Sequence, residues 1–92
     1  MKLTFNNPIK NNRTSITIND NMIRLWGTIN NYETESDDFM YDAQFKTNIN
    51  QLICDLAISY AKSISNFPTF VSYVENYMIV EAESTIKKLK IS

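Results

Sequence analysis

A run of apolar residues at helical spacing, within residues 45–64, constrains the fold of this chain more than any other feature. Its members recur every three or four positions and are Phe45, Ile49, Leu52, Ile53, Leu56, Tyr60 and Ile64. Polar residues lie between them, so the pattern predicts a helix with one apolar face. Such a face must pack against another element, which predicts a layered fold rather than an isolated helix.

An acidic stretch precedes this run and provides the residues that begin helices. Ser36 is followed by Asp37 and Asp38, whose carboxylates favour the positive N-terminal end of a helix. We therefore predict a helix over about 37–65. The alternative for its early part, residues 39–44, is a separate turn.

A second helix is predicted over about 69–89, after a break that contains Pro68. Its apolar stripe consists of Phe70, Val71, Val74, Met78, Ala82, Ile86 and Leu89. The β-branched and aromatic content of residues 77–82 leaves a strand as the alternative there. The helical stripe and the absence of turn residues favour the helix.

Residues 14–29 alternate apolar and polar side chains on both sides of a polar cluster, which predicts a β-hairpin. A two-residue turn at Asp20-Asn21 brings four aliphatic side chains onto one buried face, namely Ile16, Ile18, Ile23 and Leu25. The opposite face then carries Arg24 and Trp26. The single glycine, Gly27, predicts a bulge or a close backbone approach beside Trp26.

Together these elements predict an α+β fold in one small domain, residues 1–92. A short strand over 2–6 joins the hairpin 14–29 in an N-terminal, three-stranded antiparallel sheet. The sheet packs on the two C-terminal helices, about 37–65 and 69–89. The hydrophobic share of the sequence, 43%, is ordinary for a globular protein.

The residue types present argue against most enzymes. The chain has no histidine and one cysteine, Cys54, so it lacks the usual metal ligands and the usual acid–base group at neutral pH. One glycine rules out a glycine-rich phosphate loop, and the acidic residues lack the spacing of a calcium loop. We therefore predict a protein that is not an enzyme and uses no cofactor or metal.

Charge is unevenly distributed, which predicts a protein partner. Residues 31–60 carry six carboxylates against one lysine, whereas residues 1–30 are net basic. The predicted contacts are Arg24, Trp26, Tyr32, Glu33, Glu35, Asp37, Asp38 and Asp42. Charge complementarity points to a partner with a basic surface, such as a nucleic-acid-processing enzyme. Phage- or mobile-element-encoded inhibitors of the anti-CRISPR kind are similar to this chain in size and charge only.

Two alternatives stay open. Self-association as a homodimer through the helices is favoured by the apolar flank of residues 70–89. Weak nucleic-acid binding through Arg24 and Trp26 is disfavoured by the acidic balance. No apolar run is long enough to cross a membrane, no signal-peptide core is present, and the lone Cys54 fits a reducing compartment, so we expect a cytoplasmic protein.

Overall fold

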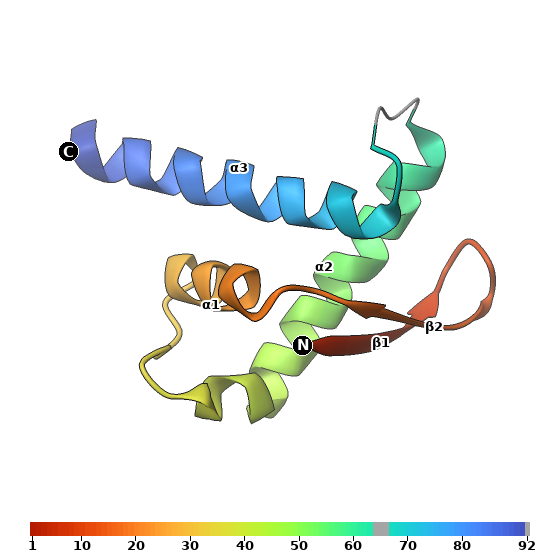
Figure 1. The fold of residues 1–92 in the computed structure, drawn as a ribbon, viewed down its shortest axis with the longest axis horizontal. Coiled ribbons are helices and arrows are strands. Elements are labelled where there is room, and N and C mark those ends of the chain that lie inside the picture. Colours follow the sequence, from red (N-terminus) through yellow and green to blue (C-terminus); the bar gives the residue numbers. More distant parts are fainter. Residues whose placement is uncertain (64–66, 92) are drawn as a thin grey trace.

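A computed structural model describes residues 1–63 and 67–91, with side chains through Lys88 (Figure 1). Its elements in chain order are β1 (Lys2–Asn7), β2 (Asn12–Thr17), α1 (Asp20–Ile29), the short 3-10 helix η1 (Asp37–Tyr41), α2 (Ala43–Lys62) and α3 (Phe70–Ile91). The fold is α+β, which confirms the predicted class. Over the described residues it contains three α-helices and one two-stranded antiparallel sheet, rather than the predicted two helices and three strands.

The hairpin is formed by β1 and β2, earlier in the chain than predicted. Lys2 lies opposite Thr17 and Asn7 lies opposite Asn12. The turn fits its asparagines, because the Asn7 side chain accepts hydrogen bonds from the backbone N–H groups of two turn residues. Asn11 adopts a left-handed φ of 55°, a conformation that asparagine tolerates better than most residues.

The second half of the predicted hairpin is a helix, so the prediction of a turn at Asp20-Asn21 followed by a strand up to residue 29 is wrong. The Asn19 side chain accepts a hydrogen bond from the backbone N–H of Asn21 at 2.8 Å and caps α1. Ile23, Trp26 and Gly27 are buried, a spacing of three and four residues that a helix places on one face. Capping and this one-sided burial outweigh the strand preference of the isoleucines.

Gly27 is a site of close backbone approach, as predicted, but in a helix and not at a bulge. A Cβ at this position would lie 3.0 Å from Cε2 of Phe39 and 3.1 Å from Cγ2 of Thr34. The absence of a side chain therefore lets the segment after α1 fold back directly onto the helix.

The predicted helix over about 37–65 is divided at Asp42, which bears out the separate turn. Asp42 has an extended backbone, with ψ at 131°, and its carboxylate accepts the backbone N–H of Phe45 at 3.0 Å. It therefore ends η1 and caps α2 at the same time. The C-terminal limit of that prediction, residues 64–65, lies outside the described residues. The segment 77–82 is helical, so the strand alternative there is wrong.

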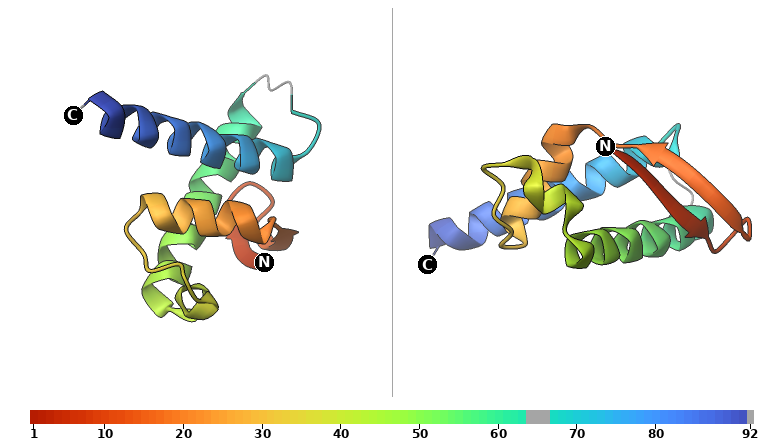
Figure 2. Two further views of the ribbon diagram at one scale, coloured as in Figure 1. Left: turned by 60° about the vertical axis from the view of Figure 1, so that its left-hand side comes forward. Right: turned by 90° about the horizontal axis from the view of Figure 1, so that it is seen from below.

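The helix α2 crosses the middle of the view in Figure 1 and lies along one side of the molecule in the right-hand view of Figure 2, so the other elements pack on one of its faces. It contacts β1, η1 and α3, while α1 packs against α3. The most deeply buried side chains come from the three α-helices and from the connection between β2 and α1. They are Ile18, Ile23, Phe45, Ile49, Ile53, Val74 and Met78. The apolar stripe of α2 is thus covered by β1, η1 and α3, with Trp26 of α1 against Phe45, and not by a three-stranded sheet.

An aromatic cluster surrounds Phe45, at the start of α2. The rings of Tyr32 and Phe39 have their centroids 5.0 Å from that of Phe45, both in edge-on contact. The Trp26 ring lies 5.6 Å away, also edge-on. Such edge-to-face pairs add to the stability gained by burying the rings. The cluster joins α1, η1 and α2 around one side chain.

Candidate functional site

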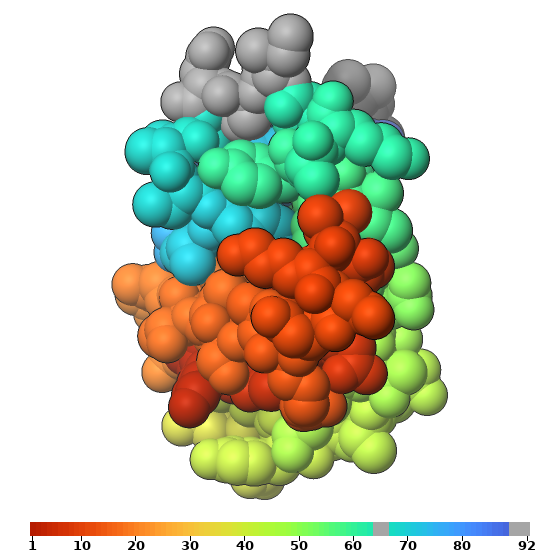
Figure 3. Space-filling view, turned by 90° about the vertical axis from the view of Figure 1, so that its right-hand side faces the viewer, coloured from red at the N-terminus to blue at the C-terminus, as the bar shows by residue number. Residues whose placement is uncertain are grey.

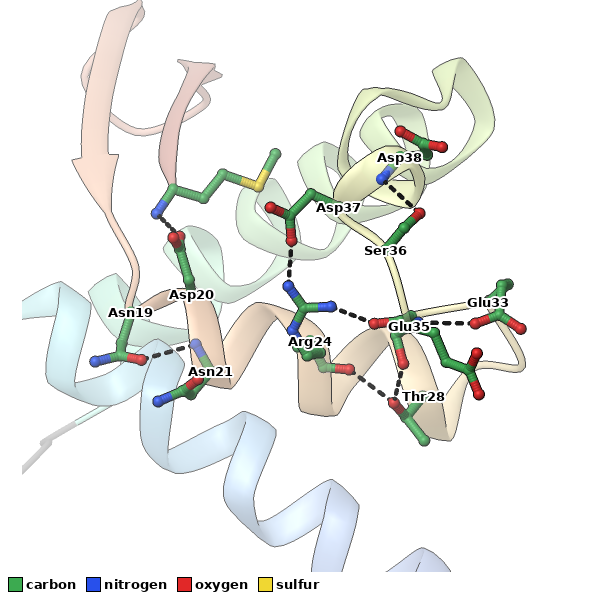
Figure 4. A network of polar contacts seen from close by, with 12 residues as sticks. Asn19, Asp20, Asn21, Arg24, Thr28, Glu33, Glu35, Ser36, Asp37 and Asp38 are labelled. Atoms are coloured by element: carbon green, nitrogen blue, oxygen red, sulfur yellow. Dashed lines mark hydrogen bonds and ion pairs between the residues drawn. The ribbon is translucent and has the colours of Figure 1, made fainter.

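The acidic segment, which we define as residues 33–42, is held against α1 by Arg24 (Figure 4). The Arg24 guanidinium donates to the backbone carbonyl of Thr34 and pairs with the Asp37 carboxylate. The same group lies over the Phe39 ring, 5.5 Å from its centroid. Arg24 is therefore occupied within the chain and sets the path of the acidic segment.

Further contacts fix the start of the acidic segment. Just before it, the Tyr32 backbone N–H donates to the carbonyl of Gly27 at 2.9 Å, and the Asn48 amide donates to the Tyr32 hydroxyl at 2.6 Å. At its second residue, the hydroxyl of Thr34 lies 2.8 Å from that of Thr28. The segment is thus a structured connection rather than a loose loop.

The structure exposes the carboxylates of the acidic segment. Five residues that the sequence predicted as contacts are all exposed, namely Glu33, Glu35, Asp37, Asp38 and Asp42. Among the described residues only Asp37 of these pairs with a cation. The other four therefore present uncompensated negative charge, although Asp42 also serves as the cap of α2.

The prediction of an exposed Trp26 is wrong. The residue retains 8% of its possible exposure and packs on Phe45 in the core. A sealed indole has no face on which a base or a partner side chain can stack, so Trp26 is removed from the accessible surface. Arg24 and Tyr32 are half-buried and engaged in contacts within the chain. Arg24 and Tyr32 hold the acidic segment in place, and Trp26 packs in the core against Phe45.

Sequence reasoning missed Tyr41, which stands beside the acidic residues with 75% of its surface exposed. In an unbroken helix, Tyr41 would lie one turn before Phe45 on the same buried face. The break at Asp42 turns its side chain outward instead. The Lys46 ammonium lies 5.8 Å from the ring centroid, on the ring face. The alternative of a separate turn over 39–44 was the sequence signal from which an exposed Tyr41 could have been inferred.

Two shallow hollows flank η1 and carry carboxylates in their walls. One, of about 330 Å³, is lined by Tyr32, Glu33, Ser36, Asp38, Phe39 and Asp42. The other, of about 390 Å³, includes Asp20, Asp37, Tyr41 and Lys46 in its lining. Both are open features of the surface beside the acidic segment.

No cluster of potential ligands suited to a metal ion occurs among the residues that the structure describes. Burial and the nearby Asp55 raise the pKa of the Cys54 thiol, which disfavours the reactive thiolate. A hydrogen bond to Glu81 and burial raise the pKa of Tyr77 to about 12. Neither group has the pKa of an activated nucleophile or base at neutral pH.

No described helix combines the length and apolar character needed to cross a membrane. Comparison with protein families, with curated proteins and with solved structures found no match to this chain.

Proposed function

We propose that this protein is not an enzyme and acts by binding another protein through the acidic segment. One observation carries the proposal: four exposed carboxylates without an ion-pair partner among the described residues lie on a segment that the fold holds in place, namely Glu33, Glu35, Asp38 and Asp42. Repulsion among them costs stability that the chain does not recover internally. A cationic partner would remove that cost on binding.

The fixed shape of the segment supports recognition rather than general attraction. Arg24, Tyr32 and Gly27 hold it against α1, so little conformational freedom is lost when a partner binds. The exposed ring of Tyr41 adds an aromatic contact of the type that dominates protein interfaces. We infer a partner with a basic surface, and a nucleic-acid-processing enzyme whose groove would be occluded fits this chemistry.

The test is a charge reversal restricted to carboxylates with no side-chain role in capping or ion pairing. The variant Glu35→Lys/Asp38→Lys alters two exposed residues whose carboxylates make no hydrogen bond among the described residues, and it leaves Asp37 and Asp42 in place. A matched control, Asp55→Lys/Glu83→Lys, makes the same change in net charge at exposed positions of α2 and α3.

Each protein is used for affinity capture from the cells that produce the wild-type chain. A partner of the acidic segment is retained by the wild type and the control, is lost from the Glu35→Lys/Asp38→Lys variant, and dissociates as salt rises. Competition by nucleic acid for the captured partner supports occlusion of a basic groove. Equal capture by all three proteins removes the acidic segment from the mechanism.

A second candidate function is self-association through α3. Among the side chains of α3 that the structure describes, three large apolar ones remain exposed, at 39% for Ile79, 53% for Val80 and 47% for Ile86. The nearby Glu83 and Lys87 have no ion-pair partner among the described residues and have opposite charges. Light scattering over a concentration series tests this: a defined dimer that Val80→Glu abolishes supports it, and a monomer at all concentrations rules it out.

A further inference from the structure

The two edges of the hairpin sheet differ in whether their backbone groups are covered. Ile18 donates its N–H to the Met1 carbonyl at 2.9 Å, and the Met1 amine donates to the Ile18 carbonyl at 2.7 Å. This opposed pair therefore exchanges both hydrogen bonds. In an antiparallel ladder such pairs alternate with pairs whose N–H and C=O groups point away from each other. The observed register assigns outward-pointing groups to Arg13, Ser15 and Thr17 of β2.

The outer edge of β1 is covered, and it confirms this alternation. Asn6 pairs with Arg13 and so points its carbonyl away from β2. The Cys54 thiol of α2 lies 3.5 Å from that carbonyl and donates to it. The helix α2 packs along β1 and so borders this edge.

The outer edge of β2 is open. No hydrogen bond among the described residues satisfies the outward N–H and C=O groups of Arg13, Ser15 and Thr17. Unpaired backbone groups persist at a surface only where water or another chain can reach them. A free row of alternate donors and acceptors is the feature to which an extended segment adds as a further strand.

An apolar groove lies beside this open edge. Its volume is about 330 Å³, and its apolar walls come from the hairpin, α2 and the start of α3: Ile9, Ile16, Ala57, Tyr60, Ala61 and Phe70. In Figure 3 the hairpin lies directly against the end of α2 and the start of α3. The groove provides the side-chain pockets that accompany backbone pairing in strand addition.

The inner face of the sheet is less covered along β2 than along β1. Leu3 and Phe5 of β1 are 4% and 2% exposed, whereas their partners Ile16 and Thr14 in β2 are only half-buried. The same face of the sheet is thus covered along one strand and uncovered along the other. Alternate side chains of an added strand would point into the groove and extend the apolar layer over Ile16.

Charge at the groove selects the occupant. Lys10 lines the groove, and Arg13 is the second residue of β2. Neither side chain pairs with a carboxylate among the described residues. A segment that pairs antiparallel to β2 has its C-terminal end at these two cations. Carboxylates at that end complement them, whereas β2 of a second copy in the same antiparallel arrangement would bring its C-terminal half, which carries no carboxylate, beside these cations.

We propose that the free edge of β2 receives an extended segment of another protein, with apolar residues at alternate positions and acidic residues at its C-terminal end. The segment adds as a third strand and places its apolar side chains in the groove. This site uses the hairpin and not the acidic segment, so it stands or falls separately from the function proposed above.

The probe is the peptide acetyl-Val-Thr-Val-Thr-Val-Asp-Glu-amide, with a scrambled peptide of the same composition as its control. Amide hydrogen exchange of the full chain is followed by NMR. At ten times its Kd the peptide slows exchange at Arg13, Ser15 and Thr17 by about 11-fold, because these amides exchange only from the free fraction. Amides of β1 that point toward α2 keep their rates.

One substitution separates backbone pairing from side-chain effects. Ser15→Pro removes an outward N–H and the hydroxyl that contacts Thr4, and it leaves the backbone hydrogen bonds to β1 intact, as proline allows at an edge strand. Ser15→Ala removes the same hydroxyl and keeps the N–H. We expect Ser15→Pro to abolish peptide binding and Ser15→Ala to preserve it.

A second variant keeps the test decisive if Ser15→Pro does not fold. Ala61→Leu fills the groove from an exposed position of α2, and Gln44→Leu makes a similar change at the other end of that helix as its control. Loss of peptide binding in Ala61→Leu alone supports the proposal. The proposal is overturned if peptide at millimolar concentration protects none of the three β2 amides, if the scrambled peptide protects them equally, or if they are protected by a second copy as protein concentration rises.

Discussion

Replacing Gly27 by alanine tests the close approach that positions the acidic segment. In the interior of a helix, alanine is favoured over glycine by about 1 kcal/mol. Helix propensity alone therefore predicts that Gly27→Ala stabilises the protein. The surroundings predict the opposite, because the new Cβ would lie 3.0 Å and 3.3 Å from two atoms of the Phe39 ring and 3.1 Å from Cγ2 of Thr34.

The steric term is the larger of the two. Carbon atoms in ordinary contact are about 3.5–4.0 Å apart, so at least one neighbour must move. The Phe39 ring is buried and packs edge-on against Phe45, which leaves it little room to yield. Overpacking of this kind costs about 1–3 kcal/mol. We expect the free energy of unfolding to fall by about 1 kcal/mol after the propensity gain is subtracted, and Tm to fall by about 4–8 °C in a chain of this size.

The assay is urea unfolding followed by tryptophan fluorescence, which reports directly on Trp26 in the core. The pair Ser59→Gly and Ser59→Ala measures the glycine-to-alanine increment at an exposed position of α2, without the steric term. In a Phe39→Leu background Gly27→Ala should cost less, with a coupling energy of about 0.5–3 kcal/mol. An increase in stability on Gly27→Ala, equal to the Ser59 increment, would refute the reasoning.

Further predictions concern the core, a helix cap and pH. Phe45→Ala removes the centre of the aromatic cluster and should lower the free energy of unfolding by about 3–5 kcal/mol in denaturant titrations. Asp42→Ala removes the cap of α2 and should cost about 1 kcal/mol, whereas Asp55→Ala on the exposed face of α2 should change stability by less than about 0.5 kcal/mol. The Tyr77 phenol should titrate near pH 12 by ultraviolet absorbance, and Glu81→Gln should bring its pKa back toward 10. Because the folded pKa is raised, the stability linked to Tyr77 is present below pH 10 and is lost as pH rises toward 12; a midpoint near 10 in the wild type would contradict the contact.

The regular helices could be predicted because their evidence is local. The stripe from Phe45 to Tyr60 and the one from Phe70 to Ala82 each repeat over several turns, and no strand places those side chains on one face. A break near Asp42 was also predicted, in the form of the alternative that residues 39–44 make a separate turn. These features depend on side-chain spacing and capping within a few residues.

The second half of residues 14–29 was misassigned because short apolar runs fit two periods. Ile16, Ile18, Ile23 and Leu25 satisfy a strand alternation about a turn. Ile23 and Trp26 satisfy a helical spacing equally well, and Asn19 is a good cap. With only ten residues in α1, propensity and pattern do not separate the two.

The candidate site divides in the same way between sequence and structure. Charge counting identified the acidic residues as exposed, since five carboxylates within ten positions cannot be buried without partners. The pairing of Arg24 with Asp37 and the burial of Trp26 against Phe45 could not be predicted in this way. Both depend on contacts between α1, η1 and α2, which no local pattern encodes.

The sequence by itself determined where helices α2 and α3 run and where negative charge collects, because amphipathic period and ionisation are properties of neighbouring residues. Only the tertiary structure decided that residues 20–29 form a helix, that the Tyr41 side chain is exposed and that the outer edge of β2 is unpaired. Those outcomes depend on which elements pack against the apolar stripe of α2. Such packing involves segments that are distant in the chain, so no local pattern specifies it.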